Sequence, residues 1–131
     1  MEDGRFRLDD FELYQSARES RRQIYSLIRQ LPPAERYCLS TQMRRAAISI
    51  SNNIAEGHGR WHFQENLQYC RTARGSVDEV IDDLNICLDE GYGDSKHVQE
   101  LKSQAYSLIA KINSYVNYLR RAQQESTRAP Q

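Results

Sequence analysis

The chain has few of the residues that mark several common protein classes. Its 131 residues include three cysteines, three prolines and six glycines, and the mean hydropathy is −0.80. An odd number of cysteines without a Cys-x-x-Cys pair argues against a disulfide framework and a structural zinc site. The scarcity of proline and glycine argues against a turn-rich β protein, and the lack of a long apolar run argues against a membrane span. We therefore expect a soluble, helical, cytoplasmic protein without membrane association.

The net charge of zero conceals an uneven distribution of charge. Residues 13–74 contain ten arginines against four glutamates, whereas residues 75–100 contain eight acidic residues against one lysine. Fifteen of the 18 basic residues are arginine, whose planar set of donors suits phosphates, carboxylates and aromatic faces. The pattern favours contacts with a partner, although a generic nucleic-acid binder is usually basic overall.

Apolar residues recur at steps of three and four along four segments, which predicts four helices. We expect these near residues 9–31, 34 or 39–56, 62–90 and 96–123, with residues 1–8 and 124–131 as flexible tails. Pro32 and Pro33 end the first segment, Gly57 is placed to cap the second in a left-handed conformation, and Ser95 can cap the fourth. Short links force neighbouring helices to run antiparallel. The predicted fold is an all-α, up-down-up-down four-helix bundle.

Two polar features interrupt the apolar pattern. The second helix carries a stripe at steps of three and four, made of Gln42, Arg45, Ser49, Asn53 and Glu56. The stripe is either a solvated face or a hydrogen-bond network between helices or subunits, and the network is favoured because serine and asparagine form helix interiors poorly. Gly75, followed by Ser76 and Glu79, lies in the middle of the third helix, where glycine costs about 1 kcal/mol relative to alanine. Either another helix approaches closely there, from the same chain or a neighbour, or the site is a simple small-residue packing position.

Six arginines are candidates for a nucleic-acid or partner surface. They come from the first three helices: Arg18, Arg21, Arg22, Arg44, Arg71 and Arg74. Arginines can neutralise phosphates while tyrosines that lie nearby in the sequence stack on bases. The alternative is an ordinary charged helix surface.

The sequence contains no recognisable catalytic or cofactor motif. There is no GxSxG, HExxH, P-loop or dinucleotide fingerprint. His58, His62 and Glu65 lie close together but have no evident fourth ligand, so we do not expect a metal site. We therefore expect no cofactor, no small-molecule substrate and no enzymatic activity. The enzymatic alternative is a small metal-dependent or nucleotide-processing enzyme that uses His58 or Glu56.

The stretch from Gln42 to Gly57, QMRRAAISISNNIAEG, resembles the hallmark of the four-helix bundle proteins encoded in intervening sequences of bacterial 23S rRNA genes. The resemblance extends over residues 14–121 and includes Gly59-Arg60, Phe63, Arg74-Gly75-Ser76 with Glu79, Gly91-Tyr92 and Tyr118-Leu119-Arg120-Arg121. It implies a bundle that assembles into a ring-like homo-oligomer, typically a pentamer. It also implies kinship with the accessory variability determinant of diversity-generating retroelements, which binds a reverse transcriptase and nucleic acid.

The resemblance implies no catalytic residues, and it gives structural and inter-subunit roles to the motif positions. These positions are Arg45, Ser49, Asn53, Glu56, Gly57, Gly75, Ser76 and Glu79. The resulting hypothesis is a non-enzymatic, homo-oligomeric scaffold or adaptor with an RNA or ribonucleoprotein partner. The alternative is an accessory protein of a diversity-generating retroelement that binds reverse transcriptase and nucleic acid.

Overall fold

The structure is a computed structural model that describes residues 7–60 and 62–127, and over these residues every regular element is helical. The four main helices are α1 (Glu12–Ile28), α2 (Leu39–His58), α3 (Phe63–Glu90) and α4 (Ser95–Thr127). Two short 3-10 helices, η1 (Leu8–Asp10) and η2 (Pro33–Glu35), precede α1 and α2. The predicted all-α class with four helices is confirmed.

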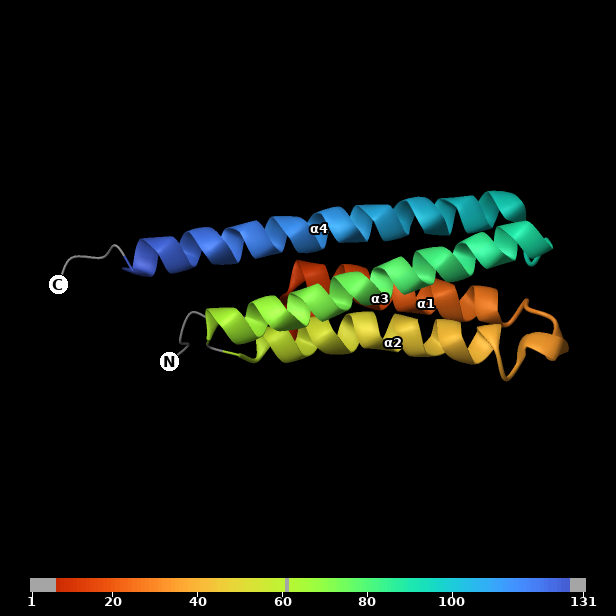
Figure 1. The fold of residues 1–131 in the computed structure, drawn as a ribbon, viewed down its shortest axis with the longest axis horizontal. Helices are drawn as coiled ribbons and strands as arrows, with labels where there is room; N and C mark the ends of the chain where they lie inside the picture. The colour runs from red at the N-terminus through yellow and green to blue at the C-terminus, as the bar shows by residue number, and fades with distance from the viewer. Residues whose placement is uncertain (1–6, 61, 128–131) are drawn as a thin grey trace.

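The helices run alternately up and down, so each packs along the helix that follows it, and α4 returns to pack against α1 (Figure 1). Their apolar stripes meet inside the bundle, where several of the largest side chains are fully buried: Ile24, Leu27, Met43, Ile50, Leu84 and Ile112. At its C-terminal end α4 extends past the start of α3. None of the described helices is long and apolar enough to cross a membrane.

The helix ends differ in detail from the sequence-based prediction. Helix α2 continues through Gly57 to His58, and Gly57 does not have a positive φ. The left-handed cap is instead Gly91, with a φ of 72° at the end of α3. The backbone nitrogen of His97 donates to Asp94 Oδ2 at 3.0 Å, so the side chain that caps α4 belongs to Asp94 rather than Ser95.

The chain ends are more helical than the predicted tails. Helix α4 continues to Thr127, four residues into the segment 124–131, and Leu8 belongs to η1. Residues 1–6 and 128–131 of the two predicted tails lie outside the described residues. Helix α1 is shorter than predicted and ends at Ile28, because the chain turns there before Pro32 and Pro33.

Candidate functional site

The polar stripe of α2 is bonded to α3 at its centre. Ser49 Oγ lies 2.8 Å from Ser76 Oγ, which in turn donates to the carbonyl oxygen of Thr72 at 3.2 Å. Asn53 Nδ2 donates to the carbonyl oxygen of Ser49 at 2.8 Å and to its Oγ at 3.1 Å. Ser76 is only 4% exposed, so these bonds satisfy a polar group inside the seam. Ser49, Asn53 and Ser76 therefore form a network between helices of one chain.

A second polar contact in the same seam involves a completely buried acid. Asp83 has an exposure of 0%, and its Oδ1 accepts a hydrogen bond from Gln42 Nε2. Its Oδ2 has no hydrogen-bond partner among the described residues. Burial raises the pKa of Asp83 to about 6, and the nearby charges of Asp82 and Glu79 act in the same direction, whereas the Gln42 bond opposes them.

The burial of Asp83 was not predicted from the sequence, although the spacing of the residue held a signal. The residue follows the buried Val80 by three positions and precedes the buried Cys87 by four, so it lies on the apolar stripe of α3. A carboxylate on an apolar stripe is either buried and bonded to a partner, or it marks the point where the apolar stripe ends. The structure shows the first case, and Gln42 is the partner.

Gly57 packs closely against residues of α3. A Cβ at this position would stand 2.6 Å from Asn66 Oδ1 and 3.3 Å from Tyr69 Cβ, so a larger residue needs the neighbours to move. Glu56 is exposed and pairs with Arg60 at 2.9 Å, and the Arg60 guanidinium stands 5.2 Å from the centre of the Tyr69 ring. Gly57 is therefore a packing residue of the hairpin, whereas Glu56 helps to hold the link that follows α2.

The remaining motif residues face outward. Arg45 and Glu79 line a surface groove of about 530 Å³ between α2 and α3, next to Ser49. Gly75 is exposed, and within residues 7–60 and 62–127 no neighbouring group lies within 4 Å of the position that a Cβ would take. An approach by another helix of the same chain therefore does not account for Gly75. The contact with a neighbouring copy remains as a proposal.

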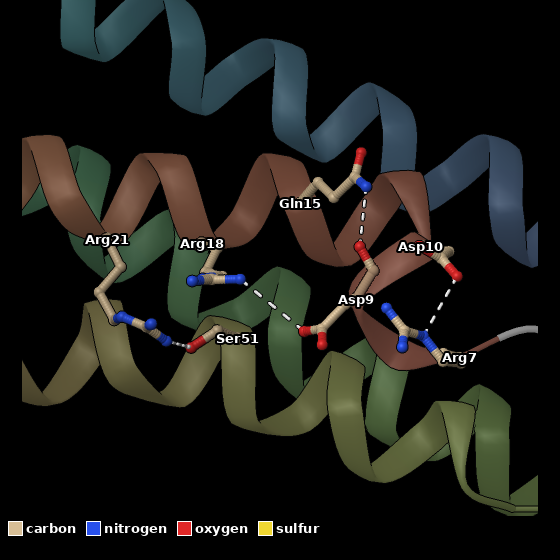
Figure 2. A network of polar contacts seen from close by, with 7 residues as sticks. All are labelled: Arg7, Asp9, Asp10, Gln15, Arg18, Arg21 and Ser51. Atoms are coloured by element: carbon tan, nitrogen blue, oxygen red, sulfur yellow. Dashed lines mark hydrogen bonds and ion pairs between the residues drawn. The ribbon is translucent and has the colours of Figure 1, made fainter.

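Two arginines of α1 have partners in the same chain (Figure 2). Arg18 Nη1 lies 3.8 Å from Asp9 Oδ1, in the turn that precedes α1. Arg21 reaches across to α2, where its Nη1 donates to Ser51 Oγ at 2.6 Å. The Arg21 bond joins α1 to α2, whereas the exposed Arg18–Asp9 pair links α1 to η1 and contributes little to stability.

Two further candidates on this side of the bundle are also engaged. Arg22 Nη1 lies 3.1 Å from Glu19 Oε1, one turn earlier on α1. The Arg44 guanidinium of α2 stands 4.9 Å from the centre of the Tyr25 ring of α1, within range of a cation–π interaction. The structure thus gives each of the four candidate arginines on α1 and α2 a partner in the chain.

Arg71 and Arg74 lie in a different place, on the side of α3 that borders α4. Together with residues of α4 they line a groove of about 350 Å³, whose lining residues are Leu67, Arg71, Arg74, Asn113, Val116, Asn117 and Arg120. Arg74 Nη1 donates to Asn113 Oδ1 at 2.6 Å. None of the ion pairs found within residues 7–60 and 62–127 uses Arg71, Arg74 or Arg120.

The α4 side of this groove was missed as part of a binding surface. Asn113, Asn117 and Arg120 follow one another at steps of four and three, so they share one side of the helix. That spacing was visible in the sequence. The rotation of α4 about its own axis, which brings this side next to Arg71 and Arg74, could not be predicted from the sequence.

The structure shows the surroundings of His58, which was considered for metal binding, and of the two buried cysteines, Cys70 and Cys87. Among the described residues no group of three His, Cys, Asp or Glu side chains could hold a metal ion. The ring of His58 packs against Phe11, with the ring centroids 5.2 Å apart. Burial raises the pKa of Cys70 and of Cys87 to about 11, so both remain protonated thiols near neutral pH.

Comparison with known proteins gives the family. The 23S rRNA-intervening sequence protein family matches residues 9–114. A similar solved structure is the crystal structure of a protein with unknown function from the S23 ribosomal protein family of Bacteroides thetaiotaomicron VPI-5482. The two share 16% identity over 79% of this chain and 97% of that one, with a TM-score of 0.74, which shows a common fold. Comparison with curated proteins finds no match. On the strength of the match over residues 9–114, the chain belongs to the 23S rRNA-intervening sequence protein family.

Proposed function

We propose that this protein is a non-enzymatic, self-associating bundle that acts as a scaffold or adaptor in association with RNA or a ribonucleoprotein. The assembly we propose is a ring of five copies, as the family resemblance implies. The structure of one copy supports self-association more directly than it supports any chemistry, because the residues of the family motif that do not hold the bundle together lie on its surface.

The observation that carries this proposal is the exposed Gly75 in the middle of a 28-residue helix. Glycine in a helix interior costs about 1 kcal/mol relative to alanine, and the described part of the chain offers no close contact in return. A glycine lets the backbone of another molecule approach to a distance that a side chain would prevent. A second copy packed across Gly75 gives this residue a function.

The groove between α2 and α3 supports the same proposal. It places the positively charged Arg45 and the negatively charged Glu79 in one exposed lining, one turn along α3 from Gly75. A surface that carries both signs of charge can be complementary to the same surface, or to a neighbouring one, on another copy. Charge complementarity sets orientation and partner choice, which a ring of identical subunits requires.

The experiment is native mass spectrometry of the protein purified at low salt without nuclease. We expect a mass of several subunits that also includes nucleotides. An oligomer without nucleotides would remove RNA from the proposal and keep the scaffold. A bare monomer of 15.3 kDa would contradict self-association.

The second candidate function is an accessory subunit that binds a reverse transcriptase together with nucleic acid. The observation that favours it is that three arginines outside the ion pairs of the described residues, Arg71, Arg74 and Arg120, line one groove between α3 and α4. This candidate predicts a stable complex with a purified retroelement reverse transcriptase, measured by size-exclusion chromatography. Elution of the two proteins at their separate positions would leave the scaffold role alone.

A further inference from the structure

The groove between α3 and α4 combines an apolar floor with a basic rim. Leu67 and Val116 are 4% and 5% exposed and form the base, while the arginine side chains of both helices stand above them. The lining residues include no carboxylate. The acids of α3 on either side of the groove are Glu65, six residues before Arg71, and Asp78, four residues after Arg74, and both lie outside the lining. The groove therefore carries positive charge that its own lining does not neutralise.

One of the arginines is held in place before any ligand arrives. Arg74 is half-buried, and one of its terminal nitrogens donates to Asn113 Oδ1 at 2.6 Å. A guanidinium has five N–H donors in a rigid plane, so this bond leaves donors available to a ligand. Fixing the side chain in advance lowers the entropy that binding must otherwise remove. Arg71 and Arg120 are exposed at the rim and can close on the same ligand.

We propose that the α3–α4 groove, built from Arg71, Arg74 and Arg120 with Asn113 and Asn117, binds the sugar-phosphate backbone of single-stranded RNA. This inference rests on the RNA association in the proposed function and assigns it to one site. Guanidinium groups recognise phosphate oxygens through paired N–H donors.

The two asparagines favour RNA over an acidic peptide. A carboxylate side chain offers only acceptors, whereas a ribose 2′-hydroxyl is both a donor and an acceptor. The Asn113 oxygen already accepts from Arg74, and Asn117 presents both kinds of group in the exposed part of the lining. A lining of guanidinium and amide groups therefore matches phosphate and ribose together.

The test compares two sets of variants that remove equal charge from different places. Arg71, Arg74 and Arg120 are each changed to Gln in one protein. The matched control changes Arg18, Arg21 and Arg22 to Gln, residues whose partners lie on η1, α2 and α1 respectively. Fluorescence anisotropy measures the affinity of each protein for a labelled single-stranded RNA of mixed sequence over a series of salt concentrations. Circular dichroism establishes that each variant is folded.

We expect the groove variant to lose about tenfold or more in affinity, with a salt dependence whose slope falls by about 2, as three lost phosphate contacts on a single strand require. The control variant should keep nearly the same affinity for RNA and nearly the same salt dependence as the wild type. Equal losses in both sets would overturn the inference, because they would show attraction by overall charge. An unchanged affinity in the groove variant would overturn it as well.

Two further arms separate this inference from the function on which it rests. If the wild type assembles but binds no RNA, the RNA part of the proposed function fails along with the groove. If the wild type binds RNA and the groove variant binds equally well, only the groove fails. Competition with polyglutamate and with inorganic phosphate identifies the ligand: RNA displaced as readily by polyglutamate as by unlabelled RNA would mean a site for acidic protein and overturn the inference.

Discussion

Helix α3 borders two neighbours, and the polar residues on its two sides behave differently. Toward α2, Ser76 and Asp83 are buried and bonded to side chains of the same chain, Ser49 and Gln42. Toward α4, Arg71 and its neighbours surround an open groove and take no part in the ion pairs of the described residues. Polar bonds join α3 to both neighbours, since Asn66 and Arg74 donate to Tyr115 and Asn113 of α4. The α4 side differs because exposed arginines also line an open groove there.

This difference shows why the position of a polar residue says more than its type. A buried hydrogen-bonding group costs free energy when its partner is removed, because the remaining group loses its solvation without compensation. An exposed arginine outside an ion pair can be replaced with little effect on the fold. Substitutions in the α2–α3 seam should consequently change stability, whereas substitutions in the α3–α4 groove should change binding.

The largest effect on stability should come from Asp83→Asn. The pKa of Asp83 rises from 3.8 to about 6, which corresponds to about 3 kcal/mol against the charged form in the folded state. The folded state holds this proton more tightly than the unfolded state, so the stability that Asp83 contributes is present below about pH 4 and is lost as the pH rises to about 6. Near neutral pH we expect Asp83→Asn to raise the free energy of unfolding by up to about 3 kcal/mol, measured by chemical denaturation.

The control is Asp82→Asn, which removes the same charge from an exposed neighbour on the same helix. It should change the free energy of unfolding by less than about 0.5 kcal/mol. The difference in the free energy of unfolding between Asp83→Asn and the wild type should shrink as the pH falls toward about 4. A gain of equal size at both pH values would contradict the assignment of the titration to Asp83.

The next effect should come from Gly57→Ala. The added Cβ would meet Asn66 Oδ1 at 2.6 Å, and Asn66 cannot turn away freely because its Nδ2 donates to the Tyr115 hydroxyl. We expect a loss of about 1–3 kcal/mol in the free energy of unfolding, since overpacking exceeds the gain in helix propensity. Gly59→Ala is the control, because its Cβ would meet only ordinary contacts at 3.6 Å and beyond. A variant at Gly57 as stable as the wild type would show that the hairpin is looser than described.

A smaller effect should come from the Ser49–Ser76 pair. Ser76→Ala removes one member of a partly buried hydrogen bond and should cost about 1 kcal/mol. The double variant with Ser49→Ala should cost less than the sum of the two single variants, because no group is then left without its partner. Thermal or chemical denaturation of the four proteins measures the coupling. Strictly additive losses in the free energy of unfolding would mean that the two hydroxyls do not interact.

The smallest effect on stability should come from the groove itself. Arg71→Gln should change the free energy of unfolding by less than about 0.5 kcal/mol, while it weakens the binding of single-stranded RNA. This variant and Ser76→Ala should therefore give opposite patterns in the same two assays. A loss of stability in Arg71→Gln comparable to that in Ser76→Ala would remove the distinction between the two sides of α3.

The sequence predicted the fold well because each helix repeats its apolar residues at helical spacing. The run from Val98 to Leu119 does so without a break, and α4 follows it. The end of α2 was predicted less well, because a glycine at this position is compatible with two roles that the sequence does not distinguish. Gly57 can be a left-handed cap at the end of the helix, or a position where another helix packs closely. Only the distance to Asn66 decides between them.

The candidate site was predicted in part. The Ser49, Asn53 and Ser76 network follows from the poor helix propensity of these residues. The grouping of the arginines did not follow, because pairing depends on which acids come within reach after the helices pack. Arg18 meets Asp9, whereas Arg71 faces α4, and helix rotation determines both outcomes.

Self-association across Gly75 is the central claim, and light scattering coupled to size-exclusion chromatography tests it most directly. The wild type is compared with Gly75→Gln at one concentration. Glutamine is a good helix former, so the variant should be at least as stable as the wild type, and a loss of assembly would not reflect unfolding. We predict several copies for the wild type and a folded single chain of about 15.3 kDa for the variant. A single chain for both proteins, or the same oligomer for both, would contradict the account.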